Sequence, residues 1–383
     1  MQVGVIKERR AGELRVAITP DTVKKYIAMG LSVFIESKAG LAAAITDQSY
    51  QDSGANIVKT SREALEKADI VLKVQKPIIP EKQGNSGLDE VALMKDGAVL
   101  ICLMEPYQSQ ELIEALANKK ITAFSMELLP RITRAQTMDT LSSQSNLAGY
   151  KAVLEAAHAF GRAFPMMMTA AGTVPPAKCL VMGAGVAGLQ AIATARRLGA
   201  VVSASDVRPA AKENVESLGA SFVAVQDEEF KQAETVAGYA KEMSDEYKAK
   251  QSELIASTVA KQDIVICTAL IPGRPAPVLV SEDMIKTMKP GSVLIDLAVE
   301  QGGNCPLSKA DKTIVKNGVS IIGQTNMASK VPIDASVLFA KNLLNFVTPM
   351  INEDEKRLGI DIDDEIIRGS MITQNGEVLQ NFT

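Results

Sequence analysis

The sequence has a single histidine, His158, and this scarcity restricts the chemistry that the chain can carry out. Dehydrogenases that oxidise an alcohol or an amine usually move a proton through a histidine, a lysine or a carboxyl group of suitable pKa. His158 lies within the helix-like pattern "YKAVLEAAHAFGRAF", where a histidine on a helix face or in the core is more frequent than a catalytic one. We therefore expect no histidine base.

Metal ligands and serine nucleophiles are also missing from the sequence pattern. No histidines, cysteines and acidic residues cluster with metal spacing, and no serine occupies a nucleophile elbow, so we expect no bound metal. The start "MQVGVIKERR" shows no apolar stretch of signal-peptide length. The cysteines lie far apart and form no CxxC pair: Cys102, Cys179, Cys267 and Cys305. A reducing, cytoplasmic compartment is the expectation.

Long apolar runs and an excess of positive charge are absent as well. Apolar runs such as residues 98–104 fall well short of the roughly 20 residues that span a bilayer, so we expect no direct membrane insertion. The net charge of -4 lacks the basic excess that a nucleic-acid backbone requires. With 383 residues the chain exceeds the usual length of one core, so two domains are expected.

Short apolar runs alternate with helix-like segments along most of the chain. Thr19 as N-cap, Pro20 at the first helical position and Gly30 as the stop predict the first helix. The predicted strands are residues 2–6, 31–37, 69–74, 98–104, 121–126, 178–182, 200–205, 263–269, 292–298 and 319–324. Such alternation predicts an α/β fold of two doubly wound, Rossmann-like parallel-sheet domains.

Two long helix-like patterns, residues 146–164 and 335–350, are predicted to cross between these domains. The N-terminal domain is then expected to comprise 1–142 with 329–383, and the second domain 143–328. Near the C-terminus, Asn375 and Gly376 predict a type I′ hairpin.

A glycine-rich turn after the predicted strand 178–182 indicates a dinucleotide site. Gly183 permits a tight turn, Gly185 lets the backbone approach a pyrophosphate, and Gly188 lets helix and strand pack closely. The helix that begins there supplies unpaired N–H groups to the phosphates. An isolated GxGxxG also occurs as a structural turn, but here strand, glycines, helix and acidic residue follow in order.

The acidic residue is Asp206, which ends the next predicted strand, where the ribose-binding carboxylate belongs. Asp206 favours NAD(H) over NADP(H), because a carboxylate accepts from ribose hydroxyls but repels a 2′-phosphate by about 4 kcal/mol at about 4 Å. Arg208 is expected to contact adenine or solvent. The neighbouring Val186 and Val207 complete this part of the predicted cofactor site. We therefore expect 143–328 to be the NAD(H)-binding domain, with the cofactor in the interdomain cleft.

Hydrogen-bonding side chains crowd a stretch without clear periodicity, "RITRAQTMDTLSSQSNLAGY", residues 131–150. It precedes the glycine-rich turn, and on the residues alone a capped turn between domains remains the alternative. Hydride transfer needs cofactors held close and aligned, with water kept out, and does not itself require a protein acid or base.

Over essentially its whole length the sequence resembles the NAD(H)-binding alpha subunit, or domain I, of proton-translocating nicotinamide nucleotide transhydrogenases. The resemblance rests on "KERRAGELRVAITP", "PRITRAQTMDTLSSQSNLAGY", "PMMMTAAGTVPPAK", "VMGAGVAGLQAIATARRLGA", "SDVRPAAKE", "ALIPGRPAP" and "LAVEQGGN". It implies three components: this one binds NAD(H), a partner binds NADP(H), and a membrane-spanning partner couples hydride transfer to proton translocation. The chain would then be peripheral at the inner membrane.

The resemblance also assigns residue roles. Arg131 would hydrogen-bond NAD(H), Gln136 would bridge toward the partner's nucleotide, and Asp139 with Ser142 would orient the nicotinamide carboxamide. Further cofactor contacts are implied for a mobile loop and for the end of the strand at 263–269: Gly238, Tyr239, Thr268, Ala269 and Leu270. Residues 165–178 are apolar and rich in small residues, and the resemblance implies an intersubunit hairpin in a homodimer there. A buried connection is the alternative.

The architecture also resembles alanine dehydrogenase, which implies a pyruvate-binding arginine and lysine with a catalytic histidine and aspartate. Arg15 matches the arginine and has a second interpretation, as a structural ion-pair residue. Gln75 stands at the lysine position, Met104 in the histidine region and Glu300 at the acidic position, so this activity is disfavoured. A non-catalytic NAD sensor is a third possibility, which the polar stretch at 131–150 disfavours.

Overall fold

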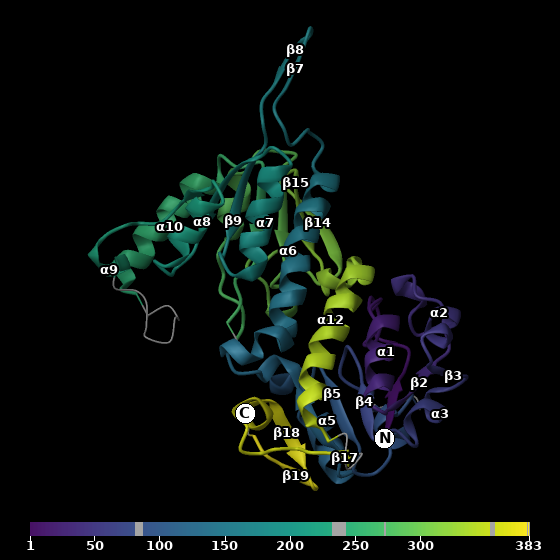
Figure 1. Ribbon diagram of the computed structural model, residues 1–383. Helices are drawn as coiled ribbons and strands as arrows, with labels where there is room; N and C mark the ends of the chain where they lie inside the picture. Colours follow the sequence, from purple (N-terminus) through teal and green to yellow (C-terminus); the bar gives the residue numbers. More distant parts are fainter. Residues whose placement is uncertain (81–86, 232–242, 272, 353–356, 381, 383) are drawn as a thin grey trace. The chain divides into compact units, whose positions relative to one another are not determined.

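The computed structural model describes residues 1–80, 87–231, 243–271, 273–352, 357–380 and 382. Contacts divide the chain into two units (Figure 1). The first unit comprises Met1–Gln144 with Ser329–Thr383, and the second comprises Ser145–Ala328. Each unit is built on one large, mostly parallel sheet, which confirms the predicted α/β class.

The first unit has an eight-stranded sheet in the order β19-β18-β6-β5-β4-β1-β2-β3. Its strands are β1 Gln2–Val5, β2 Ser32–Glu36, β3 Asn56–Val58, β4 Ile70–Leu72, β5 Val99–Cys102, β6 Thr122–Ser125, β18 Met371–Gln374 and β19 Glu377–Val378. The pairs from β3 to β6 are parallel, whereas β18 and β19 add antiparallel strands at one edge. The sheet is therefore mostly parallel, as predicted, with a mixed edge.

The β18–β19 hairpin has the predicted turn. Asn375 and Gly376 have φ of 52° and 93°, and Gln374 pairs with Glu377 across them. Both central residues of a type I′ turn require positive φ, so the Asn-Gly prediction is confirmed.

Helices flank this sheet and include one with the predicted caps. They are α1 Pro20–Ala28, α2 Asp47–Asp52, α3 Ser61–Leu65, α4 Glu90–Leu93, α5 Gln110–Asn118, α12 Pro332–Val347 and α13 Glu365–Ser370. In α1, Thr19 is the N-cap and Pro20 the first residue, while Gly30 follows with φ of 81°. The short 3-10 helices of this unit are η1 Leu41–Ala43, η2 Pro106–Gln108, η3 Met126–Leu128, η4 Thr133–Met138 and η7 Thr348–Met350. A further 3-10 helix, η6 Met327–Lys330, contains the division between the units, which falls after Ala328. A small ladder pairs β16 Ile351–Asn352 with β17 Arg357–Leu358.

Apolar side chains cover both faces of the first sheet. In β4, Ile70 and Leu72 belong to one hydrophobic cluster, which also contains Phe339, whereas Val71 belongs to a second cluster with Leu112. Successive strand residues point to opposite faces, so the fully apolar strand reflects burial on both sides.

The second unit has a seven-stranded sheet in the order β11-β10-β9-β12-β13-β15-β14. Its strands are β9 Lys178–Met182, β10 Val201–Ser205, β11 Ser221–Phe222, β12 Ile264–Cys267, β13 Val293–Asp296, β14 Lys312–Lys316 and β15 Val319–Gly323. All neighbours are parallel except β14, an antiparallel edge strand that the sequence pattern did not predict. The strand order reverses at β9 and β12, the switch point where doubly wound sheets bind ligands.

Helices of the second unit are α7 Val186–Arg197, α8 Ala211–Ser217, α9 Glu228–Lys231, α10 Asp245–Val259 and α11 Glu282–Thr287, with the 3-10 helix η5 Val299–Gln301. The helix α6, Thr140–Ala159, contains the division between the units, which falls after Gln144. It begins six residues before the predicted 146–164 and ends before Phe160, so part of the polar stretch is helical. None of the helices in the described ranges is both long and apolar enough to cross a membrane.

Residues 165–178 form a hairpin within the second unit. Strand β7, Met167–Thr169, pairs antiparallel with β8, Gly172–Val174. Figure 1 shows this hairpin extending away from the sheet of its unit. Met168 is 80% exposed, so the alternative of a buried connection is wrong. Self-association through the hairpin stays a prediction.

Candidate functional site

The glycine-rich turn between β9 and α7 is shaped by close backbone packing. Gly183 has a φ of 100°, and a Cβ on Gly188 would lie 1.8 Å from the Gly183 carbonyl oxygen. Gly149 of α6 packs equally closely, because its Cβ would lie 2.0 Å from the Ala187 oxygen. Gly185 is the N-cap of α7, and an added Cβ there would meet nothing within 4 Å. The space around Gly185 thus lies beside the unpaired N–H groups at the start of α7, which begins at Val186.

Asp206 follows β10 and faces this turn. Its Oδ2 accepts from Ala184 N at 2.7 Å and from Arg208 Nη2 at 2.9 Å, while Oδ1 accepts from Arg208 N and Nε, both at 2.9 Å. Burial by itself would raise the pKa of Asp206, but the hydrogen bonds from Arg208 and Ala184 lower it below the ordinary value. The carboxylate is therefore ionised at neutral pH.

Arg208, which was expected to contact adenine or solvent, makes an additional contact within the protein. Its guanidinium forms an ion pair with Asp206, with Nε 2.9 Å from Oδ1. The two residues are separated by one position, so a planar guanidinium can reach both carboxylate oxygens side-on. This pairing was not predicted from the sequence.

The end of β12 completes the same edge of the second sheet. Thr268 Oγ1 donates to the carbonyls of Met182 and Gly183, at 3.3 and 3.1 Å. Ala269 N donates to Asn304 Oδ1 at 3.1 Å, and Asn304 Nδ2 donates back to Ala269 O at 2.9 Å. These bonds fix the exit of β12 against the glycine turn.

Asn304 was missed as a functional residue. It is fully buried and also donates to Pro277 O at 2.8 Å, so it ties the backbone at Ala269 to the backbone at Pro277. The one signal in the sequence was the "QGGN" segment, because Gly302 and Gly303 have φ of 94° and 84° and aim Asn304 inward.

The predicted cofactor residues of the second unit gather at this edge of the sheet. The side chains of Val186, Val207 and Leu270 are 41%, 53% and 48% exposed. Apolar side chains left open beside unpaired helix N–H groups suit the mixed surface of a dinucleotide. Gly238 and Tyr239 lie outside the described residues.

The polar stretch that contains Arg131, Gln136, Asp139 and Ser142 belongs to the first unit. It forms η4 and the first turn of α6. Asp139 Oδ1 accepts from Ser142 N at 2.9 Å, and Ser142 Oγ donates to Asp139 Oδ2. Arg131 and Gln136 are exposed. The structure thus brings Asp139 and Ser142 into contact and leaves the Gln136 amide open to solvent.

Arg15, which matches a pyruvate-binding arginine in alanine dehydrogenase, takes part in a buried ion-pair network. Arg15 Nε and Nη2 donate to the two oxygens of Glu13, at 2.9 and 2.7 Å, and Arg15 Nη1 donates to Gln144 Oε1 at 2.8 Å. Gln75 Nε2 also donates to Glu13, at 3.0 Å. Arg15 is 3% exposed, so the interpretation of Arg15 as a structural ion-pair residue is confirmed.

This network predicts an acid-sensitive contribution to stability. Burial opposes ionisation of Glu13, but the hydrogen bond and charge of Arg15 lower its pKa from 4.5 to about 2. A carboxylate with a depressed folded-state pKa stabilises the fold above the unfolded value and loses that contribution as pH falls through the folded value. At about 1.4 kcal/mol per pKa unit, roughly 3 kcal/mol is expected to disappear between pH 4.5 and 2. Chemical denaturation of Glu13→Gln across this window should show a flatter pH dependence than the parent; parallel curves would contradict the assignment.

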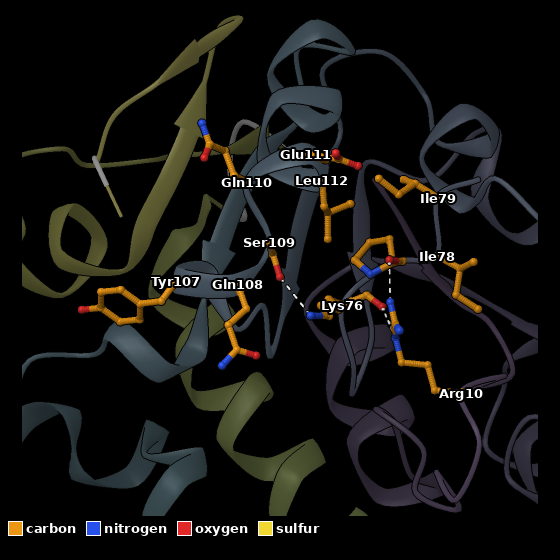
Figure 2. A pocket seen from close by; sticks show the side chains of 11 residues that line it. Arg10, Lys76, Ile78, Ile79, Tyr107, Gln108, Ser109, Gln110, Glu111 and Leu112 are labelled. Atoms are coloured by element: carbon orange, nitrogen blue, oxygen red, sulfur yellow. Dashed lines mark hydrogen bonds between the residues drawn. The ribbon is translucent and has the colours of Figure 1, made fainter. Parts of the chain in front are cut away.

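A separate pocket of about 690 Å³ lies in the first unit (Figure 2). Arg10 donates to the carbonyls of Lys76 and Pro77, each at 3.1 Å. Lys76 Nζ donates to Glu105 at 2.6 Å and to Ser109 at 3.0 Å. The pocket's cations already have protein acceptors, and none of the sequence-predicted site residues lines it.

Comparison with known proteins places both parts of the chain in one family. Residues 4–148 match the alanine dehydrogenase/PNT N-terminal domain, and residues 152–381 match the alanine dehydrogenase/PNT C-terminal domain. The chain belongs to the alanine dehydrogenase/PNT family. Both predicted resemblances are therefore confirmed.

Within the alanine dehydrogenase/PNT family the transhydrogenase branch is the more similar. The chain is 57% identical to an NAD(P) transhydrogenase subunit alpha of Rhodospirillum rubrum, over 99% of this chain and 98% of the relative. It is 31% identical to alanine dehydrogenase of Methanococcus maripaludis, over 99% and 94%. The solved structure of transhydrogenase from Sinorhizobium meliloti matches with a TM-score of 0.88 and 49% identity, over 99% of this chain and all of that one.

Proposed function

We propose that the chain is the NAD(H)-binding alpha subunit of a proton-translocating transhydrogenase. Hydride passes directly between NAD(H) held by this chain and NADP(H) held by a partner component. The observation that carries the proposal is the open glycine turn beside an ionised Asp206, in a chain similar over nearly its full length to transhydrogenase alpha subunits. The proposed NAD(H)-binding domain corresponds to residues 143–328.

The residues at the edge of the second sheet fit NAD(H) better than NADP(H). The space at Gly185 admits a pyrophosphate beside the α7 N–H groups. Asp206 accepts from the ribose hydroxyls, and its charge disfavours a 2′-phosphate. Each carboxylate oxygen already accepts two hydrogen bonds. A ribose hydroxyl therefore takes the place of an Arg208 donor, which swings toward the adenine.

No proton-transfer residue is needed for the proposed reaction. Bound NAD(H) supplies the nicotinamide that gives or receives hydride. Gln136 offers two donors and an acceptor and does not titrate, which suits a group that orients the rings without exchanging protons. Arg131 holds the dinucleotide, and the contact between Asp139 and Ser142 presents fixed groups to the carboxamide. Thr268, Ala269, Leu270, Gly238 and Tyr239 complete the proposed cofactor contacts.

Proton coupling belongs to other components in this proposal. A membrane-spanning partner translocates protons, and this chain stays in the cytoplasm, peripheral at the inner membrane through its partners. The exposed methionines of the β7–β8 hairpin form an apolar surface suited to a homodimer contact. A monomeric mass in solution would contradict the dimer.

A two-protein transfer assay tests the proposed function. This chain is mixed with a transhydrogenase NADP(H)-binding component, and hydride transfer from NADPH to an NAD⁺ analogue of distinct absorbance is followed. Fast transfer that requires both proteins is expected. Failure to transfer, with NADH binding confirmed and a competent partner, would overturn the proposal. The alternative, an alanine dehydrogenase-like amino acid dehydrogenase, would then be tested with L-alanine.

Replacing Gln136 with asparagine is expected to slow hydride transfer and leave NADH affinity nearly unchanged. The shorter amide keeps the same donors and acceptor but misplaces the rings, and a misplacement of about 1 Å costs on the order of a hundredfold in rate. Transfer rate is measured with the partner component, and NADH affinity by titration of this chain alone. A large loss of NADH affinity with normal turnover would show that Gln136 binds the cofactor without aligning it.

A further inference from the structure

Two asparagines of α12 hold the carbonyl of Thr137, the residue after Gln136. Asn342 Nδ2 donates to Thr137 O at 2.8 Å, and Asn345 Nδ2 donates to the same oxygen at 2.9 Å. Residues three apart share a helix face, so both amides reach Thr137 from one side of α12. Carbonyls in the last turn of a helix have no hydrogen-bond donor within that helix. The Thr137 carbonyl accepts two hydrogen bonds from donors outside η4.

Asn342 makes a second contact that joins η4 to α6. Its Oδ1 accepts from Ser143 Oγ at 2.8 Å. The Asn342 amide therefore bonds to Thr137, which precedes Asp139, and to Ser143, which follows Ser142. Asn342 is only 7% exposed, so its side-chain amide is largely shielded from water.

The segment between these two anchor points needs external support. Short 3-10 helices have poor internal hydrogen-bond geometry, so η4 gains little rigidity from its own bonds. Gln136 belongs to η4 and is exposed. The next residue is Thr137, whose carbonyl oxygen accepts the two hydrogen bonds from α12. A functional side chain on such a segment is held in place by the residues that fix its backbone.

We propose that Asn342, assisted by Asn345, is a positioning residue for hydride transfer. It fixes the backbone on both flanks of the Gln136–Ser142 segment and touches neither nucleotide. The inference rests on the proposed function, because it assigns to α12 the task of keeping Gln136, Asp139 and Ser142 in register. If this is so, residues of α12, distant in sequence from the Gln136–Ser142 segment, affect the rate of hydride transfer without changing the affinity for NADH.

The test compares Asn342→Ala and Asn345→Ala with the parent protein. Three quantities are measured: the maximal transfer rate with the NADP(H)-binding component, the NADH dissociation constant of this chain alone, and amide hydrogen exchange across 133–144. For Asn342→Ala we expect about a tenfold lower rate, a dissociation constant within about twofold of the parent's, and faster exchange confined to 133–144. Asn345→Ala removes one bond only, and its rate should fall by about two- to threefold.

Ser336→Ala is the matched control on the same helix. Ser336 is fully buried, accepts from Val16 N at 3.0 Å and donates to Pro332 O at 2.6 Å. Replacing Ser336 removes two hydrogen bonds, as replacing Asn342 does. We expect this variant to lose stability but to keep its transfer rate and its exchange pattern at 133–144. Equal rate losses in Ser336→Ala and Asn342→Ala would overturn the positioning role.

The remaining outcomes separate this inference from the proposed function. Absence of transfer by the parent with a competent partner would refute the proposed function, and with it the positioning role. Normal parental transfer with unchanged rates in both asparagine variants would refute the positioning role alone. If Asn342→Ala fails to fold, the rate and exchange of Asn345→Ala decide the question.

Discussion

Gly188→Ala is expected to destabilise the second unit strongly, whereas Gly185→Ala is expected to keep the fold and lose NADH affinity. A Cβ on Gly188 would lie 1.8 Å from Gly183 O and 3.2 Å from Thr268 Oγ1, so α7 would have to move away from the turn after β9. Overpacking of this kind costs about 1–3 kcal/mol or more, and the contact with rigid backbone places Gly188 at the upper end. The new methyl group at Gly185 meets no protein atom within 4 Å and stands where a pyrophosphate would approach.

Denaturant unfolding and NADH titration distinguish the two effects. Gly188→Ala should lose about 3 kcal/mol or more. Gly185→Ala should lose less than about 1 kcal/mol as an N-cap substitution, with NADH binding about ten- to a hundredfold weaker. Gly161→Ala is the control within the same unit, because its Cβ also meets nothing within 4 Å. Normal NADH affinity in Gly185→Ala would mean that no phosphate approaches this turn.

Local signals made the glycine turn and most of the fold predictable. An apolar strand followed by Gly183, Gly185 and Gly188 has a narrow set of conformations, because the first and third glycines tolerate no side chain there. The Asn375–Gly376 turn is similarly local. In both cases the conformation depends on a few consecutive residues and can be inferred from them.

Contacts between residues far apart in the chain account for what sequence reasoning missed. Asn304 bonds to Ala269, and Asn342 bonds to Thr137, each through a side-chain amide and a backbone carbonyl. Such bonds leave no periodicity in the sequence. The edge strand β14, Lys312–Lys316, escaped because its side chains are mostly exposed and lack an apolar pattern.

The early start of α6 has a related explanation. Its first turn reads Thr140, Leu141, Ser142 and Ser143, which has little apolar periodicity and weak helix propensity. Asp139 caps this turn by accepting from Ser142 N, and Ser143 bonds to Asn342 of α12. Capping and a tertiary contact therefore decide the boundary, and the spacing of Asp139 and Ser142 was the one local signal in the sequence.

Lys73→Ala is expected to destabilise the first unit by about 3–5 kcal/mol, because it leaves two buried carboxylates without their cation. Lys73 Nζ lies 3.2 Å from Glu8 Oε2 and 3.2 Å from Glu90 Oε2, and the three side chains are at most 3% exposed. Glu90 Oε1 has no hydrogen-bond partner among the described residues, so the cluster has no spare donor to replace the ammonium.

The matched control for this prediction is Lys95→Ala. Lys95 pairs with Asp69 at 2.5 Å, but the two side chains are 48% and 31% exposed, so removing Lys95 should cost at most about 1 kcal/mol of stability.

The Lys73 cluster also predicts a pH dependence, because burial raises the pKa of Glu8 even with Lys73 present. An acid with a raised folded-state pKa keeps its proton to higher pH in the folded state than in the unfolded state, so Lys73→Ala should regain stability as pH falls from neutral toward the ordinary pKa of a glutamic acid. Denaturant unfolding at several pH values measures both effects. Equal losses in the two lysine variants would mean that water reaches the cluster and screens its charges.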